Sequence, residues 1–351
     1  MDFASDNAAG VAPAIMDAMV RANAGHAIGY GEDALSRRLE RRFSALFERE
    51  VAVFLVTTGT AANALALAHL SPPWGAVLCH SEAHCVVHEC GAPEFYGGGL
   101  RLLGIDGEAG KLAPKTVAAA LDRHFGLGPH QVVPAALTLT QATELGTIYR
   151  LDEIAALAEL AHARGMTVHM DGARFANAVS RLGATAAETT WKAGVDVLSF
   201  GATKGGALAA EAIVFFDPAR AVAMAERRKR GGHLLSKHRF VAAQFEAFLA
   251  DDLWLDLARQ ANRMADRLAA DLNRIDLRPV WPVEANMLFV LLPQYMHQRL
   301  ETAGAHYYVI GSDRTDPDTI PPHHVLARLA TSFATTNGDI DKFVALAKQS
   351  R

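Results

Sequence analysis

The chain has 351 residues, half of them apolar, with 21 % charged residues and a formal net charge of -4. This composition excludes a disordered chain and a globally basic nucleic-acid binder. At about 100 to 200 residues per domain, the length predicts two domains, or one large domain with a smaller one appended. Aromatic residues make up only 7 % of a chain rich in Ala and Gly, which is typical of an α/β enzyme.

The chain has three cysteines, Cys79, Cys85 and Cys90, and this small, odd number argues against a disulfide framework. A reducing compartment, the cytoplasm, is therefore the expected location of the protein. The first residues lack the basic start and the apolar core of a secretory signal. No apolar run approaches the about 18 residues that a membrane span needs. We therefore expect a soluble, cytoplasmic protein with no membrane partner and no nucleic-acid partner.

Apolar residues at helical spacing predict two helices near the start, over 12–22 and 33–49. Strands and helices then alternate. The expected strands are 51–56, 76–79, 100–104, 132–139, 166–170, 195–200 and 212–216. The expected helices among them are 61–70, 114–124 and 151–164. This alternation predicts an α/β fold with a mostly parallel sheet sandwiched by helices.

The pattern becomes helical from about residue 217 to 275 and then mixed. The remaining elements expected are a strand over 287–292, a helix over 294–303, a strand over 326–331 and a final helix. We therefore expect an N-terminal segment over 1–25, a large α/β domain over 26–250 and a small C-terminal α+β domain over 251–351. The N-terminal segment can pack against either domain.

The first candidate site follows the strand 51–56, where Thr58, Gly59 and Thr60 open a helix. Backbone N–H groups and the positive end of the helix dipole favour an anion there, and small residues let a phosphate approach. Because no Gly-Lys-Thr run follows, this is not a Walker motif. An ordinary capped strand–helix turn remains the alternative.

Two further candidates lie at later strand ends, where open α/β sheets bind ligands. Asp171 ends one predicted strand, and His169 lies on the same face of it. A carboxylate at this position either meets a cationic or hydrogen-bond donor group or caps the next helix. Lys204 follows another strand and is flanked by small residues, including Gly205 and Gly206. This surrounding suits Schiff-base chemistry on a flat cofactor, although a surface lysine is the alternative. A phosphate cradle, an Asp and then a Lys is the order of a pyridoxal phosphate site.

The sequence resembles the threonine aldolases, a family of fold-type-I pyridoxal phosphate enzymes, along most of its length. The matching stretches are Ser5-Asp6-Asn7, Tyr30-Gly31-Glu32-Asp33, Thr58-Gly59-Thr60-Ala61-Ala62-Asn63, His84 with Glu89, His169-Met170-Asp171-Gly172-Ala173-Arg174, Thr203-Lys204-Gly205 and Arg328-Leu329-Ala330-Thr331. Each stretch is weak alone. The His-x-Asp-Gly-Ala-Arg run followed by Lys204 is the strong combination.

The resemblance implies a role for each matching residue. Lys204 would bind the cofactor covalently, Asp171 would pair with its ring nitrogen, and His84 would stack on the ring and act as base. Thr58, Gly59, Thr60, Arg174 and Thr203 would belong to the cofactor site, with Gly59 and Thr60 binding phosphate. Arg174 and Arg328 would bind the substrate carboxylate, with Ser5 close to it. Tyr30 would reach the site of a neighbouring subunit in a homo-oligomer, a tetramer or a dimer.

One stretch departs from the family pattern. Many threonine aldolases have a Glu-Asn-Thr-His-Asn run before the Asp strand, and its His contacts the substrate β-hydroxyl. The matching stretch here is 140–146, and we place Thr143 at the His position. A divergent branch that accepts bulkier substrates such as phenylserine is therefore expected.

The resemblance implies retro-aldol cleavage of L-β-hydroxy-α-amino acids to glycine and an aldehyde. The alternatives are a β-eliminating lyase, an aminotransferase and a non-catalytic protein that retains the fold. A basic run over 226–233 predicts a solvated helix end, or a cation such as Arg228 or Lys237 that reaches a partner's phosphate. His80, His84 and His88 recur every four residues, but without a metal motif we expect no catalytic metal.

Overall fold

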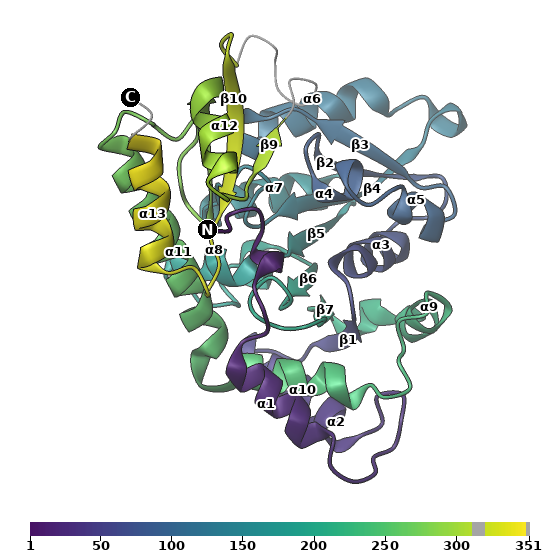
Figure 1. Cartoon of the computed structure of the whole chain (residues 1–351). Coiled ribbons are helices and arrows are strands. Elements are labelled where there is room, and N and C mark those ends of the chain that lie inside the picture. Colours follow the sequence, from purple (N-terminus) through teal and green to yellow (C-terminus); the bar gives the residue numbers. More distant parts are fainter. Residues whose placement is uncertain (311–319, 349–351) are drawn as a thin grey trace.

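The computed structural model describes residues 1–310 and 320–348, arranged around two sheets (Figure 1). The large sheet has the strand order β1-β7-β6-β5-β4-β2-β3. Its strands are β1 (Ala52–Val56), β2 (Gly75–His80), β3 (Arg101–Ile105), β4 (Val133–Thr140), β5 (Thr167–Gly172), β6 (Val197–Gly201) and β7 (Glu211–Phe215). Strands β6, β5, β4, β2 and β3 pair in parallel, whereas β7 is antiparallel to both its neighbours. The predicted mostly parallel sheet is thus confirmed.

Helices cover both faces of this sheet (Figure 1). They are α1 (Pro13–Ala22), α2 (Ala34–Leu46), α3 (Gly59–Leu70), α4 (His84–Val87), α5 (Ala92–Tyr96), α6 (Pro114–His124), α7 (Leu151–Ala163), α8 (Phe175–Leu182), α9 (Met224–Arg230), α10 (Arg239–Phe248) and α11 (Leu253–Asn273). Helix α3 packs its Ala and Leu side chains on β6 and β7. The opposite face is covered by α2, α7, α8 and α10. Apolar residues on both faces explain why the central strands are nearly continuous hydrophobic runs.

The C-terminal part forms a second, antiparallel sheet with the order β8-β10-β9. Its elements are β8 (Met287–Pro293), α12 (Gln294–Thr302), β9 (Tyr308–Ile310), β10 (His324–Ala330) and α13 (Asn337–Lys348). The predicted strands near 287 and 326 and the helices are present. The three-residue β9 is too short to leave a pattern in the sequence.

Two segments connect the large and small cores. Helix α11 places Trp254 in the large core and Leu268 in the small one. The N-terminal segment places Phe3 in the small core, where its backbone bonds to His306 and Ala330, and Ile15 in the large core. In Figure 1 this dark purple segment runs from the small sheet past the end of the large one. The segment therefore packs against both domains rather than one.

Within the described ranges, no helix is long and apolar enough to cross a membrane.

Candidate active site

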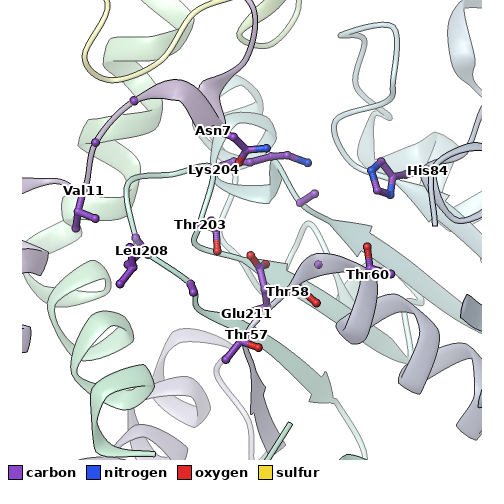
Figure 2. A pocket seen from close by; sticks show the side chains of 16 residues that line it. Asn7, Val11, Thr57, Thr58, Thr60, His84, Thr203, Lys204, Leu208 and Glu211 are labelled. Carbon is purple, nitrogen blue, oxygen red and sulfur yellow. The ribbon is translucent and has the colours of Figure 1, made fainter. Parts of the chain in front are cut away.

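A cavity of about 590 Å³ lies where the expected strand ends meet (Figure 2). Its walls come from the segments after β1 and β6, the start of β7, helix α4 and the N-terminal segment. The polar and charged residues of its lining include Asn7, Thr58, Thr60, His84, Lys204 and Glu211. Figure 2 shows Lys204 extending across the cavity in the direction of His84. The carboxyl edge of the parallel sheet therefore forms a polar pocket with a lysine inside it.

The segment after β1 forms an anion-binding helix start. Thr58 caps α3 in an extended conformation, and its Oγ1 accepts the N–H of Ala61 at 3.1 Å. The first N–H groups of a helix have no partner inside it, so those of Gly59 and Thr60 are available to a ligand. Gly59 has open space where a side chain would be. This donor set fits a phosphate group.

Lys204 lies in a tight loop after β6, in which the N–H of Gly205 donates to Ala202 O at 3.0 Å. We expected small residues here so that the backbone could approach a flat ring. The structure gives a different reason for Gly205, because a Cβ there would lie 2.8 Å from the Phe248 ring. The glycine allows this loop to pack on α10, and that packing fixes the direction of Lys204.

Asp171 is the next-to-last residue of β5 and is only 5 % exposed. Its Oδ2 accepts the Nδ2–H of Asn63 at 2.8 Å, and its Oδ1 accepts the N–H of Ala173 at 3.0 Å. Two donors thus fix this buried carboxylate, which offsets part of its desolvation cost. Its position at a strand end fits a partner for a protonated ring nitrogen.

A chain of side chains links Asp171 to His84. The same Asn63 amide donates to Glu89 Oε1 at 2.9 Å, and the His84 Nδ1–H donates to that oxygen at 2.8 Å. The hydrogen bond to Glu89 raises the pKa of His84, which Glu144 and Asp171 also raise. Since Nδ1 faces Glu89, Nε2 is the ring nitrogen of His84 left for the cavity.

His169 lies on the same face of β5 as Asp171, but its two ring nitrogens are engaged within the sheet. Nδ1 bonds to Thr138 at 2.7 Å and Nε2 to Ser199 at 2.9 Å. Complete burial lowers the pKa of His169 to about 4. This residue is therefore neutral and ties β5 to β4 and β6.

Arg174 forms a buried bidentate ion pair with Asp6. Its Nε donates to Asp6 Oδ2 at 2.8 Å and its Nη2 to Oδ1 at 3.1 Å, and Asn286 also donates to Asp6 at 3.1 Å. This pairing keeps the pKa of Asp6 low and that of Arg174 high, against the effect of burial. Asp6 thus occupies the fork that the resemblance assigns to the substrate carboxylate.

Arg328 has free hydrogen-bonding capacity. Its Nη2 donates to Ala4 O at 3.0 Å, its guanidinium lies 4.9 Å from the Tyr308 ring centre, and its buried Nε has no hydrogen-bond partner among the described residues. Burial and the nearby Arg174 lower the pKa of Arg328. A cation that is desolvated, close to a like charge and incompletely bonded favours an incoming carboxylate.

None of the five expected substrate residues, Ser5, Tyr30, Thr143, Arg174 and Arg328, is among the residues that line this cavity. Thr143 is fully buried, with its Oγ1 2.7 Å from that of Thr147. Ser5 caps the short helix η1 (Asp6–Ala8) by accepting the N–H of Asn7 at 3.2 Å, which places it beside the Asp6–Arg174 pair. The neighbour of Thr143, Glu144, acts electrostatically on His84, Arg174 and Arg328.

Tyr30 lies outside the lining of the cavity and is 53 % exposed. It lies beside the basic run, with Lys229 Nζ 4.8 Å from its ring centre, and it shares a smaller cavity with Arg228 and His238. Within α9 and the residues after it, Arg228 Nη1 approaches His238 Nε2 at 3.5 Å. Tyr30 and Arg228, two of the residues expected to serve a partner's site, therefore line one cavity, and Lys204 is not among its lining residues.

The histidines 80, 84 and 88 do not converge on one point. His80 Nε2 bonds to Gly107 O at 3.1 Å, whereas His84 faces Glu89. Among the residues that the structure describes, no group of three or more His, Cys, Asp or Glu side chains could hold a metal ion.

The sequence pattern does not predict the roles that three residues have at this site. Asn63 was one polar residue in an Ala- and Leu-rich helix, Glu211 began an apolar strand, and Glu144 was hidden by the placement of Thr143. A lone polar residue inside an apolar element is the signal that could have found Asn63 and Glu211, because burial requires a partner.

The fold and the site define a fold-type-I pyridoxal phosphate enzyme, because a helix-start anion site, a buried Asp and a Lys meet at the carboxyl edge of the sheet. A solved serine palmitoyltransferase from S. paucimobilis with bound pyridoxal phosphate shares the fold at 14 % identity and a TM-score of 0.70. The structural match covers all of this chain and 87 % of the palmitoyltransferase chain.

The chain belongs to the beta-eliminating lyase family, whose model matches residues 2–294. It is similar to the low specificity L-threonine aldolase of Pseudomonas aeruginosa, with 45 % identity over 87 % of this chain and 88 % of that protein. A solved threonine aldolase of Leishmania major matches with a TM-score of 0.92 and 29 % identity, covering 99 % of this chain and 98 % of that one. The chain is thus a lyase with pyridoxal phosphate as its cofactor.

Proposed function

We propose that this protein cleaves L-β-hydroxy-α-amino acids, including threonine, allo-threonine and phenylserine, to glycine and an aldehyde. The observation that carries the proposal is the convergence of Lys204, His84 and the Asp171 network on one cavity, with Arg328 nearby. The named activity of the Pseudomonas and Leishmania relatives supports it.

Each residue of the cofactor site has its own role in the proposed reaction. Thr58, Gly59 and Thr60 would hold the phosphate group, Lys204 would be the residue that binds the cofactor covalently, and Asp171 would pair with its ring nitrogen. When bound, the cofactor supplies a cationic ring that accepts the electron pair left at the substrate Cα.

His84 takes the proton of the substrate β-hydroxyl through its free Nε2, so that the aldehyde can leave. Glu89, bonded to Nδ1, stabilises the imidazolium that forms and is the main reason why the pKa of His84 is raised. Arg328 holds the substrate carboxylate. Arg174, which is already bonded to Asp6, orients this side of the site and adds positive charge.

The family description favours one other reaction, elimination of a β-substituent. It uses the same electron-accepting cofactor but yields pyruvate and ammonia in place of glycine and an aldehyde. Product analysis of a single incubation therefore separates the two reactions.

We further propose that the protein works in the cytoplasm as a homo-oligomer, a tetramer or a dimer, with shared sites. Tyr30, Arg228 and Lys229 lie together outside the lining of the Lys204 cavity. Exposed apolar side chains lie on α1 and in the loop after it, namely Met16, Val20 and Ile28. A second copy that covered this surface would bury them and bring the cations near its own site.

The test is to supply the full chain with pyridoxal phosphate, record its absorption spectrum and measure glycine and aldehyde from each substrate. Lys204→Ala should lose the absorption of the lysine-bound cofactor and most turnover, because no other lysine is among the described residues that line the cavity. Lys192→Ala, which removes an exposed lysine paired with Glu48, is the matched control. A wild type that releases no glycine, or a Lys204→Ala variant with normal turnover, would contradict the proposal.

A further inference from the structure

A buried carboxyl group lies at the cavity, and the roles above do not use it. Glu211 is the first residue of β7 and is 6 % exposed, yet it lines the cavity with Thr58 and Lys204. In Figure 2 its carboxyl group points between Thr203 and Thr58. A buried acid that faces a ligand cavity needs a chemical reason, because its charged form is costly to desolvate.

The strand pairing explains why Glu211 lies beside the phosphate cradle. It is paired with Val56 of β1 on one side and with Gly201 of β6 on the other. Val56 directly precedes the segment that starts α3. Glu211 also shares its face of β7 with Ile213, which packs among α3 residues. Its side chain thus lies on the sheet face that the start of α3 covers.

Charged and hydrogen-bonding groups act on Glu211 from several elements. Burial raises the pKa of Glu211, hydrogen bonds from Thr203 and the charge of Lys204 lower it, and the charge of Asp171 raises it, so that together they bring it to about 7. Two histidines also border the site: His84, and His233, which bonds to Thr57 at 3.2 Å. At neutral pH the group is therefore divided between its charged and neutral forms.

A phosphate group changes this balance. Two negative groups in one poorly hydrated cavity repel strongly, so the bound phosphate disfavours the carboxylate form. A neutral carboxylic acid avoids the repulsion and gains an O–H donor, which phosphate oxygens accept well.

We propose that Glu211 takes up a proton when the cofactor binds and, as a neutral acid, donates a hydrogen bond to its phosphate group. This inference rests on the proposed placement of the phosphate at Thr58, Gly59 and Thr60. It gives Glu211 a binding role in the cofactor pocket, distinct from that of the catalytic pair Lys204 and His84.

Proton uptake by Glu211 makes cofactor affinity depend on pH. If phosphate binding raises the pKa of Glu211, the bound state holds more protons than the free state above about pH 7. Cofactor affinity then falls as the pH rises through that range, by up to about tenfold per pH unit. Below pH 7 the acid is already neutral and this contribution levels off.

The test uses pyridoxamine 5′-phosphate, which carries the phosphate but no aldehyde and so cannot join covalently to Lys204. Its Kd is measured from pH 6 to 9 for the cofactor-free wild type, Glu211→Gln and Glu211→Ala. Glutamine is always neutral and keeps a donor. We expect wild type and Glu211→Gln to bind alike near pH 6, and the wild type to bind about tenfold more weakly at pH 9.

Glu211→Ala should bind more weakly than Glu211→Gln throughout, because it lacks the donor. Glu246→Gln, which changes a carboxylate bonded to Arg42 elsewhere in the protein, should keep the pH dependence of the wild type. His84, His233 and Lys204 are present in every variant, so the difference between wild type and Glu211→Gln isolates Glu211.

Calorimetry of the wild type in buffers of different ionisation enthalpy gives an independent proton count, which does not depend on any variant folding. Because an affinity loss of about tenfold by pH 9 corresponds to uptake of roughly half a proton at pH 8, that uptake is expected, and zero uptake or release overturns the proposal. Parallel pH curves for wild type and Glu211→Gln also overturn it, while leaving the cofactor site intact. If the wild type does not bind pyridoxamine 5′-phosphate, the proposed cofactor site itself is wrong and this inference falls with it.

Discussion

Asn63 shows how one side chain organises several others at this site. Its amide donates to Glu89 and to Asp171, two buried acids that would otherwise repel each other at close range. Desolvation raises the pKa of Glu89, and the Asp171 charge raises it further. The amide therefore joins Glu89, which supports the base His84, and Asp171, the proposed partner of the ring nitrogen, in one network. This role explains the presence of a polar residue in an Ala- and Leu-rich helix.

Glu144 is the residue for which we make a pH prediction. Its carboxylate raises the pKa of His84, so Glu144→Gln should lower it. If neutral His84 is the base, activity should then persist to more acidic pH, with the acid limb of kcat/KM moved to lower pH. The measurement is the pH profile of kcat/KM for threonine cleavage.

The matched control for this prediction is Glu153→Gln, which removes a carboxylate paired with Lys111 outside the cavity. It should leave the acid limb in place. An unchanged acid limb in Glu144→Gln would mean that His84 is not the titrating base or that Glu144 does not act on it.

At the scale of elements, the reversed direction of β7 decides which residue meets the phosphate cradle. Because β7 runs antiparallel to β1 and β6, its first residue lies beside the last residues of both neighbours. A parallel strand would place its last residue there instead. Glu211 therefore reaches the functional edge although it begins a strand, and sequence reasoning that looks only at strand ends passes over it.

The short N-terminal helix η1 is bound to α8 through the Asp6–Arg174 pair, and this contact carries a stability prediction. Asp6→Ala leaves the Arg174 cation buried without its partner, which should cost about 3–5 kcal/mol of unfolding free energy. Urea unfolding of the apo-protein measures the loss.

The pH dependence of that stability has a definite sign. The pKa of Asp6 is lowered from its ordinary 3.8, so its contribution is complete above that value and is lost as the pH falls through the lowered pKa. Asp266→Ala, which breaks the more exposed pair with Arg181, should cost about 1 kcal/mol or less. Equal losses in the two variants would show that the buried pair has no special weight.

At the scale of the whole molecule, two hydrophobic cores are joined by α11 and by the N-terminal segment. This arrangement lets Arg328 of β10 lie near Arg174 of the large domain, as the charge of Arg174 lowers the pKa of Arg328. The carboxylate-binding side of the site therefore depends on both cores, whereas the phosphate cradle and Lys204 belong to the large one.

The proposed sharing of sites in an oligomer leads to a complementation prediction. Lys204→Ala and Tyr30→Ala proteins should each be nearly inactive alone. In a mixed dimer, one site combines the intact Lys204 of one copy with the intact Tyr30 of the other, so random reassembly should restore about a quarter of the sites.

The measurement is turnover after the two variants are co-expressed or refolded together, with each variant treated alone as the control. Size-exclusion chromatography of the wild type should show an assembly larger than one chain. A monomeric wild type, or mixing that restores nothing, would contradict shared sites.

The sequence by itself determined the fold class and the cofactor class of this protein. Strands alternating with helices require a largely parallel sheet, and the carboxyl ends of its parallel strands meet at one edge. Thr58, Asp171 and Lys204, each placed after or at the end of a strand, could therefore be expected to converge before any coordinate was known.

Only the tertiary structure decided what those residues touch. Asn63 and Asp171 are 108 positions apart, and Asp6 and Arg174 are 168 apart. No local pattern encodes such pairs, because hydrogen bonds and charges act through space rather than along the chain. For the same reason the sequence alone did not reveal that Asp6 occupies the Arg174 fork, that the charge of Glu144 acts on His84, or that Glu211 lies beside the phosphate cradle.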